Sequence, residues 1–150
     1  MYHELSAALG FLELGDPDSA WEELELIPAE DRARPMVLRM RVEIYIAKER
    51  WMEMAEIARH LTEIQPEEPA HWVNRAWAER RHVGFEIAEQ TLLKALEGFP
   101  DESIIHYNLA CYVCCQGRIE EAKERLAKAI ELDPQFRALA LEDEDLEGVW

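Results

Sequence analysis

The sequence repeats itself at an interval of 34 residues, and this period constrains the fold more than any other feature. Proline closes three successive apolar stretches in this register, at Pro66, Pro100 and Pro134. A period of this length indicates stacked copies of one small structural unit. Small and apolar residues recur without a gap in four further columns: Ala20, Met54, Ala88 and Ala122; Ala8, Val42, Ala76 and Ala110; Leu24, Ala58, Leu92 and Leu126; Ile27, Leu61, Ala95 and Ala129.

Each unit predicts two helices joined by a short turn. In the last unit, apolar residues spaced by three and four form a stripe over residues 105–113, and a second stripe follows Gly117. In the first unit, Gly15, Asp16 and Pro17 form a helix stop, an N-cap and a proline in the first turn. Sustained strand alternation is absent from the sequence, so we expect an all-α chain. After Pro28, residues 29–34 are expected to form a longer connection or an added turn.

The register predicts a single domain over residues 1–150. Four helix-turn-helix repeats are expected at residues 1–34, 35–68, 69–102 and 103–136. Residues 137–150 are expected to form a capping helix and an acidic tail, because the last unit of a stacked array must cover its open face. We expect Leu139, Leu141 and Trp150 to cover that face, and the acidic run from Glu142 to Asp145 to be solvated.

The units resemble those of the tetratricopeptide repeat (TPR) family. Residues 103–136 carry the resemblance through Leu109, Ala110, Gly117, Ala122, Ala129 and Pro134, and residues 69–102 carry it through Trp72, Ala76, Ala88, Leu92, Ala95 and Pro100. Met54 departs from the pattern, since a small residue is expected there. The resemblance implies an α-solenoid, a right-handed superhelix whose first helices line a concave groove. It also implies that this groove binds a peptide or a helix of a partner protein.

The first helices would present polar and aromatic side chains on the face opposite the packing columns. Arginines on this face could bind a carboxylate, and aromatic side chains would add apolar area. We therefore expect a groove that accepts an acidic segment of a partner protein. The alternative is that the arginines pair with Glu43, Glu79 or Glu86 on a solvated face. The candidate partner-binding residues are Arg39, Glu43, Asn74, Trp77, Arg80, Arg81, Tyr107, Asn108 and Cys111.

Charge and composition exclude several other functions. The 16 basic and 32 acidic residues give a formal net charge of −16, which opposes binding to nucleic acid or to an anionic membrane. The sequence has no apolar run long enough to span a bilayer, and residues 1–20 carry acids without a basic stretch, which argues against a secretory signal. The three cysteines lie within residues 111–115, so a disulfide framework is not expected. We therefore expect a cytoplasmic protein.

The cysteines are the one cluster with reactive chemistry. Cys111, Cys114 and Cys115 share a helical face and could supply thiolates to zinc or copper(I), with His82 or His106 as a further ligand. The simpler interpretation is that they pack as small hydrophobic side chains.

No catalytic pattern stands out in the sequence. It contains no Gly-rich phosphate loop, no G-x-S-x-G and no H-E-x-x-H. We expect a non-catalytic interaction scaffold without a cofactor. Two alternatives remain: a self-associating structural protein that uses a stripe of Leu5, Leu9 and Leu12, forming a homo-oligomer, and a thiol- or metal-responsive protein.

Overall fold

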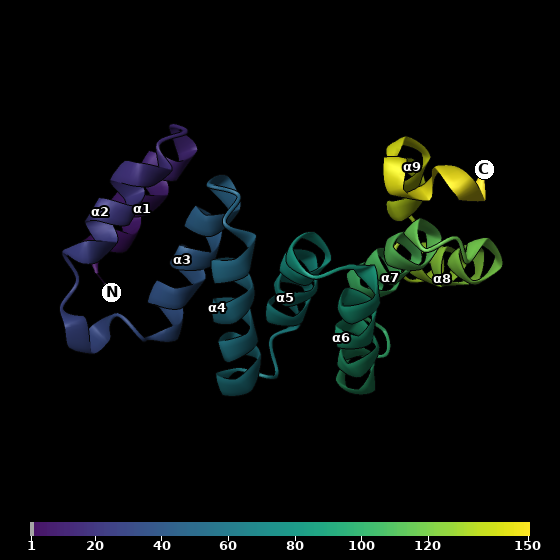
Figure 1. The fold of residues 1–150 in the computed structure, drawn as a ribbon, viewed down its shortest axis with the longest axis horizontal. Helices are drawn as coiled ribbons and strands as arrows, with labels where there is room; N and C mark the ends of the chain where they lie inside the picture. The colour runs from purple at the N-terminus through teal and green to yellow at the C-terminus, as the bar shows by residue number, and fades with distance from the viewer. Residues whose placement is uncertain (1) are drawn as a thin grey trace.

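The helix pairs follow one another along the long axis of the molecule, from α1 and α2 at one end to α7 and α8 at the other, where α9 lies over them (Figure 1). The computed structural model describes residues 2–150; Met1, the first residue of the first expected repeat, lies outside them. Within residues 2–150 there is no β-strand. The α-helices are α1 (His3–Glu13), α2 (Pro17–Glu25), α3 (Pro35–Ala47), α4 (Trp51–Ile64), α5 (Pro69–His82), α6 (Phe85–Gly98), α7 (Ser103–Cys115), α8 (Ile119–Leu132) and α9 (Phe136–Glu142), and two short 3₁₀ helices are η1 (Ala29–Asp31) and η2 (Glu144–Val149).

Three of the turns inside helix pairs use the same backbone geometry. Gly15, Glu49 and Gly117 occupy the same position of the 34-residue period and have φ angles of 77°, 54° and 84°. The next residue donates its amide to a carbonyl in the preceding helix, which closes a Schellman motif. These bonds are Asp16 to Phe11 at 2.8 Å, Arg50 to Tyr45 at 2.9 Å and Arg118 to Val113 at 3.2 Å. Glycine adopts the left-handed conformation without strain, whereas the Cβ of Glu49 makes the same conformation strained.

Proline or a capping side chain marks the start of three of the helices. Proline occupies the first turn of α2, α3 and α5. Asp16 caps α2, because its Oδ1 accepts the Ser19 amide at 3.1 Å and its Oδ2 accepts the Ser19 hydroxyl at 2.6 Å. After Pro28 the chain makes the added turn η1. Arg32 donates there to the carbonyls of Ile27 at 2.9 Å and Glu25 at 2.6 Å, so it closes the end of α2.

The repeated columns form the core of the molecule. Every residue of the four columns defined above is buried. The first cluster joins α1, α2 and α3 around Leu24, the second joins α3, α4 and α5 around Leu61, and the third extends from α5 to η2 around Leu109. Because each cluster takes side chains from adjacent helix pairs, the pairs stack into an α-solenoid, as predicted.

Aromatic contacts join one helix pair to the next. The first residue of α4, Trp51, meets Trp77 of α5 with ring centroids 5.4 Å apart. Phe85, the first residue of α6, likewise meets Tyr112 of α7 at 6.0 Å. Near the N-terminus, Trp21 of α2 meets Tyr45 of α3 at 5.5 Å.

The C-terminal cap buries different residues from those expected. Leu139, Leu141 and Trp150 remain 52%, 59% and 61% exposed, so the prediction that they cover the last face was wrong. Phe136 instead stacks on Tyr107 of α7 at 4.7 Å, and α9 places Ala140 one turn later on the same buried face. Further apolar cover comes from η2, through Leu146, whose side chain has no exposed surface, and through the partly buried Val149. None of the helices in residues 2–150 has both the length and the apolar character required to cross a bilayer.

Candidate functional site

Two neighbouring pockets flank α5, between the first helices α3, α5 and α7. The first pocket, of 260 Å³, is lined by Met36, Arg39, Met40, Val42, Glu43, Leu61, Ala70, His71 and Asn74. The second pocket, of 250 Å³, is lined by Val73, Trp77, Arg80, Asn108, Cys111, Tyr112, Asp143 and Asp145. We call the two pockets together the inner groove.

Equivalent repeat positions line this groove. Met40, Asn74 and Asn108 stand 34 residues apart on α3, α5 and α7. Three neighbours of this column, Glu43, Trp77 and Cys111, keep the same interval and also line the pockets. The 34-residue period thus places residues of three successive first helices on one surface.

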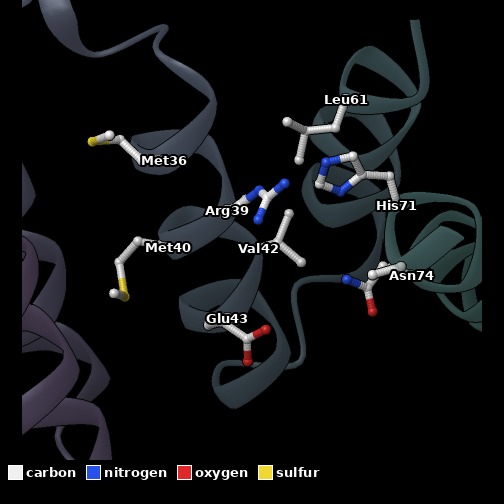
Figure 2. Close-up of a pocket in the computed structure, with 9 residues that line it drawn as sticks. Met36, Arg39, Met40, Val42, Glu43, Leu61, His71 and Asn74 are labelled. Carbon is white, nitrogen blue, oxygen red and sulfur yellow. The ribbon is translucent and has the colours of Figure 1, made fainter. Parts of the chain in front are cut away.

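The first pocket has an apolar lining and polar groups at its rim. Arg39 and Val42 point from α3 toward α5, which carries His71 and Asn74, while Met36 and Met40 project from the other side of α3 (Figure 2). Such a pocket can hold an apolar side chain while the rim meets polar backbone groups of a bound segment.

Gln65 links two of the polar groups at this rim. Its Oε1 accepts a hydrogen bond from Arg39 at 3.1 Å and lies 2.9 Å from Nε2 of His71, which therefore carries the donating hydrogen. Burial, together with the charge of Arg39, holds the pKa of His71 below its usual range. The imidazole is therefore neutral near pH 7. Arg39 also lies 3.8 Å from Glu68, and its side chain remains about half exposed.

An ion pair between Arg80 of α5 and Asp145 of the segment formed by residues 143–149 lines the second pocket. Nη1 and Nη2 of Arg80 donate to the two carboxylate oxygens of Asp145 at 2.7 and 3.2 Å. The guanidinium also lies 4.8 Å from the ring centre of Phe85 and 5.3 Å from that of Tyr112. Its hydrogen bonds hold the pKa of Asp145 below the usual range, despite the opposing effect of burial. The expectation of a solvated acidic run is therefore wrong for Asp145.

Asp143 makes a second polar contact, which joins the segment of residues 143–149 to α7. The Tyr107 hydroxyl donates to Asp143 at 2.6 Å, and the Cys111 thiol donates to the same carboxylate with a sulfur–oxygen distance of 3.7 Å. Burial and the carboxylate raise the pKa of both Tyr107 and Cys111. Burial and the charge of Asp145 raise the pKa of Cys115 to about 11. Cys111 and Cys115 are therefore protonated near pH 7.

The surroundings of Cys111 favour the protonated thiol over a thiolate that binds a metal ion. A sulfur of Cys111 and one oxygen each of Asp143 and Asp145 lie within 4.8 Å of one another. Both carboxylates are already engaged, however, by Tyr107 and Arg80. Metal binding needs the thiolate, which the raised pKa of Cys111 disfavours. His106, a further ligand proposed from the sequence, instead places Nε2 2.7 Å from the carbonyl of Pro100.

The structure brings most of the candidate partner-binding residues together. Tyr107 lies beside them through its bond to Asp143. Arg81 lines neither pocket, and its guanidinium lies 5.3 Å from the ring centre of Trp51 of α4. Those that line the two pockets are Arg39, Glu43, Asn74, Trp77, Arg80, Asn108 and Cys111.

Sequence reasoning did not identify several groove residues. Met40 would have been found by stepping the 34-residue register back from Asn74, whereas Met36 is equivalent to Ala70 and carries no such signal. Asp143 and Asp145 carry no such signal, because their acidic run is also typical of a solvated tail.

The leucine stripe proposed for self-association contributes to the interior of the first helix pair. Leu5 is buried in the first cluster, and Leu12 packs against that cluster. Leu9 remains exposed.

Comparison with known proteins identifies the fold. No protein-family model matches the sequence, and no curated protein matches it. Among solved structures, MamA from residue 41 to its end, from Desulfovibrio magneticus RS-1, has a TM-score of 0.73 at 14% identity, covering 97% of this chain and 86% of that one. MamA MSR-1 has a TM-score of 0.74 at 22% identity, covering 89% and 76%.

A third similar structure is named as a repeat protein. TTC0263, described as a thermophilic TPR protein in Thermus thermophilus, has a TM-score of 0.72 at 21% identity and covers 92% of this chain and 76% of that one. At these identities the likeness establishes the fold, and function must be argued from the residues of the groove. The chain has the fold of a tetratricopeptide repeat protein, an α-solenoid of helix pairs closed by a C-terminal cap.

Proposed function

We propose that the chain is a non-catalytic scaffold that binds a segment of a partner protein in the inner groove. Proteins with the TPR fold typically act as scaffolds for protein–protein interaction. The observation that carries the proposal for this chain is the repeat register of the groove lining. Met40, Asn74 and Asn108, at equivalent positions of α3, α5 and α7, line the two pockets that flank α5.

The chemistry of the inner groove suits a peptide or a helix. Carboxamide side chains offer both a donor and an acceptor, so Asn74 and Asn108 can bond to the backbone of a bound segment. Methionine adapts its shape to different apolar side chains, which suits the exposed Met36 to an interaction surface. For a short peptide we expect a dissociation constant of about 1 µM, because the helices already hold the groove open and little ordering is needed on this side.

Affinity capture from a lysate of the source organism tests the proposal. The bait is the full chain, compared with a groove variant that carries Arg39→Glu and Asn74→Ala. We expect partners identified by mass spectrometry with the native chain to be reduced by roughly tenfold with the variant, because a rim charge is reversed and a backbone-binding amide is removed.

A control variant carries matched substitutions on the second helices. Arg59→Glu and Gln90→Ala remove an arginine and an amide from exposed positions of α4 and α6. This variant should recover the same partners as the native chain. Equal recovery by all three proteins, with unchanged circular dichroism, would refute binding in the groove.

A further inference from the structure

The α5–α7 end of the inner groove is already occupied by part of the chain. The occupant is the segment from Asp143 to Val149, which we call the C-terminal segment. Asp143 accepts from Tyr107 at 2.6 Å, and Asp145 accepts from both terminal nitrogens of Arg80. Leu146 follows them and is fully buried in the third cluster. The segment therefore makes two carboxylate contacts and one apolar contact within four residues.

The groove here has the chemistry of an anion acceptor. The Arg80 side chain is only 16% exposed. Its guanidinium also lies near the rings of Phe85 and Tyr112, so its position is defined by packing from two helices. An arginine held this way requires a carboxylate partner, because an unpaired charge in such surroundings is strongly unfavourable. Any segment that lies in this end of the groove must therefore present an acidic group to Arg80.

The C-terminal segment covers only part of this end. Between Asp145 and α5 the second pocket remains open, with a volume of 250 Å³. The segment forms a short 3₁₀ helix at the end of the described chain, and Glu144 and Glu147 on it are exposed. An incoming segment can thus reach the pocket beside Arg80 while the resident segment is in place.

We propose that the α5–α7 end of the groove binds acidic segments of partner proteins with the spacing Asp-x-Asp-Leu, and that the chain's own Asp143–Leu146 occupies this acceptor until a partner displaces it. This inference rests on the proposed function and adds the chemistry of the partner. The tether gives the resident segment a high effective concentration, so a partner binds more weakly to the native chain than to a chain whose own segment is released.

A synthetic peptide tests this acceptor on the full chain. The probe has the sequence of residues 142–150, EDEDLEGVW, with an N-terminal fluorophore, and binding is followed by fluorescence anisotropy. The release variant carries Asp143→Asn and Asp145→Asn, which remove the charges that face Tyr107 and Arg80. We expect it to bind the peptide roughly tenfold more tightly than the native chain, or better, because the competing tethered segment is weakened.

Two matched proteins show whether the effect is specific. Glu144→Gln with Glu147→Gln removes the same number of charges from exposed positions of the same segment, and this protein should bind the peptide as the native chain does. Adding Arg80→Gln to the release variant should abolish the tighter binding. Equal affinity of the native, release and control proteins would overturn the inference, as would a folded release variant that binds no peptide.

Hydrogen exchange in the native chain provides a measurement that needs no substitution. Saturating peptide should speed amide exchange in residues 143–149 and leave α1 and α2 unchanged; unchanged exchange in the segment would contradict displacement. The two proposals fail separately. If the release variant bound the peptide no more tightly than the native chain, while partner capture still depended on Arg39 and Asn74, only the acidic acceptor would be refuted. If the peptide bound as expected, while capture did not depend on Arg39 and Asn74, only the proposed function would be refuted.

Discussion

At the scale of single residues, Arg80 and Asp145 join elements that are distant in sequence. Their side chains form a two-point ion pair between residues 65 positions apart. Such a geometry is stronger than a surface pair because both guanidinium nitrogens donate and the surrounding rings limit access of water. The ionised carboxyl group of Asp145 therefore contributes to holding the C-terminal segment on the solenoid, beside the contacts of Asp143 and Leu146.

The pH dependence of stability tests this contribution. The pKa of Asp145 in the folded chain lies below its ordinary value of 3.8, chiefly through its hydrogen bonds with Arg80. Above pH 3.8 the ion pair contributes fully, and as the pH falls from there through the lowered pKa the contribution is lost, because the unfolded chain takes up the proton more readily. Thermal unfolding should show Asp145→Asn melting several degrees below the native chain at pH 7, and this difference should narrow below pH 3.8.

A charge change beside Asp145 serves as the control. Glu147 is exposed on the same 3₁₀ helix, so Glu147→Gln should melt close to the native temperature across this pH range. A difference between Asp145→Asn and the native chain that stayed constant down to the lowest pH would show that the effect arises from shape and not from charge.

At the scale of helices and turns, the local sequence predicted most of the fold. Gly15 and Gly117 end their helices in the left-handed conformation, and Pro28 ends α2 with an added turn, because these effects need only neighbouring residues. The C-terminal segment was not predicted, since its position depends on an ion pair with Arg80, far away in the sequence. The groove shows the same difference. The 34-residue register predicts which positions line it, but the contact of Arg81 with Trp51 could not be predicted, because it depends on how adjacent helices pack.

The three Schellman turns provide a test of backbone strain. Gly117→Ala forces a Cβ into the left-handed region and should reduce the free energy of unfolding by about 1 kcal/mol. At the same register, Glu49→Gly relieves strain that is already present, with part of the gain offset by the greater entropy of glycine in the unfolded chain. It should therefore raise the free energy of unfolding by about 0.5 kcal/mol. Urea titration followed by circular dichroism measures both changes.

Glu49→Ala separates the backbone effect from loss of the side chain. Alanine keeps the strained conformation and removes only an exposed carboxylate, so its free energy of unfolding should stay close to that of the native chain. If Glu49→Ala stabilised the protein as much as Glu49→Gly, charge and not backbone strain would be the cause.

At the scale of the whole molecule, the buried apolar side chains of residues 2–150 form three clusters that follow one another along the solenoid. The first lies at the N-terminal end, and the third extends from α5 to the C-terminal segment. In a stacked array each unit contacts only its neighbours, so stability is a sum of local terms and different parts open with different free energies. The first pocket of the groove shares α3 with the first cluster, whereas the second pocket lies beside the third cluster. The second pocket should therefore keep its shape when the N-terminal pair opens.

A matched pair of cavity substitutions tests this local stability. Leu24 in the first cluster and Leu109 in the third are both fully buried, so Leu24→Ala and Leu109→Ala should each cost about 2–5 kcal/mol. Hydrogen exchange with mass spectrometry should show Leu24→Ala speeding exchange in α1, α2 and α3 only, and Leu109→Ala speeding it from α5 to the C-terminus. If either substitution accelerated exchange evenly along the chain, the solenoid would open as one cooperative unit, and opening of the N-terminal pair would also disrupt the second pocket.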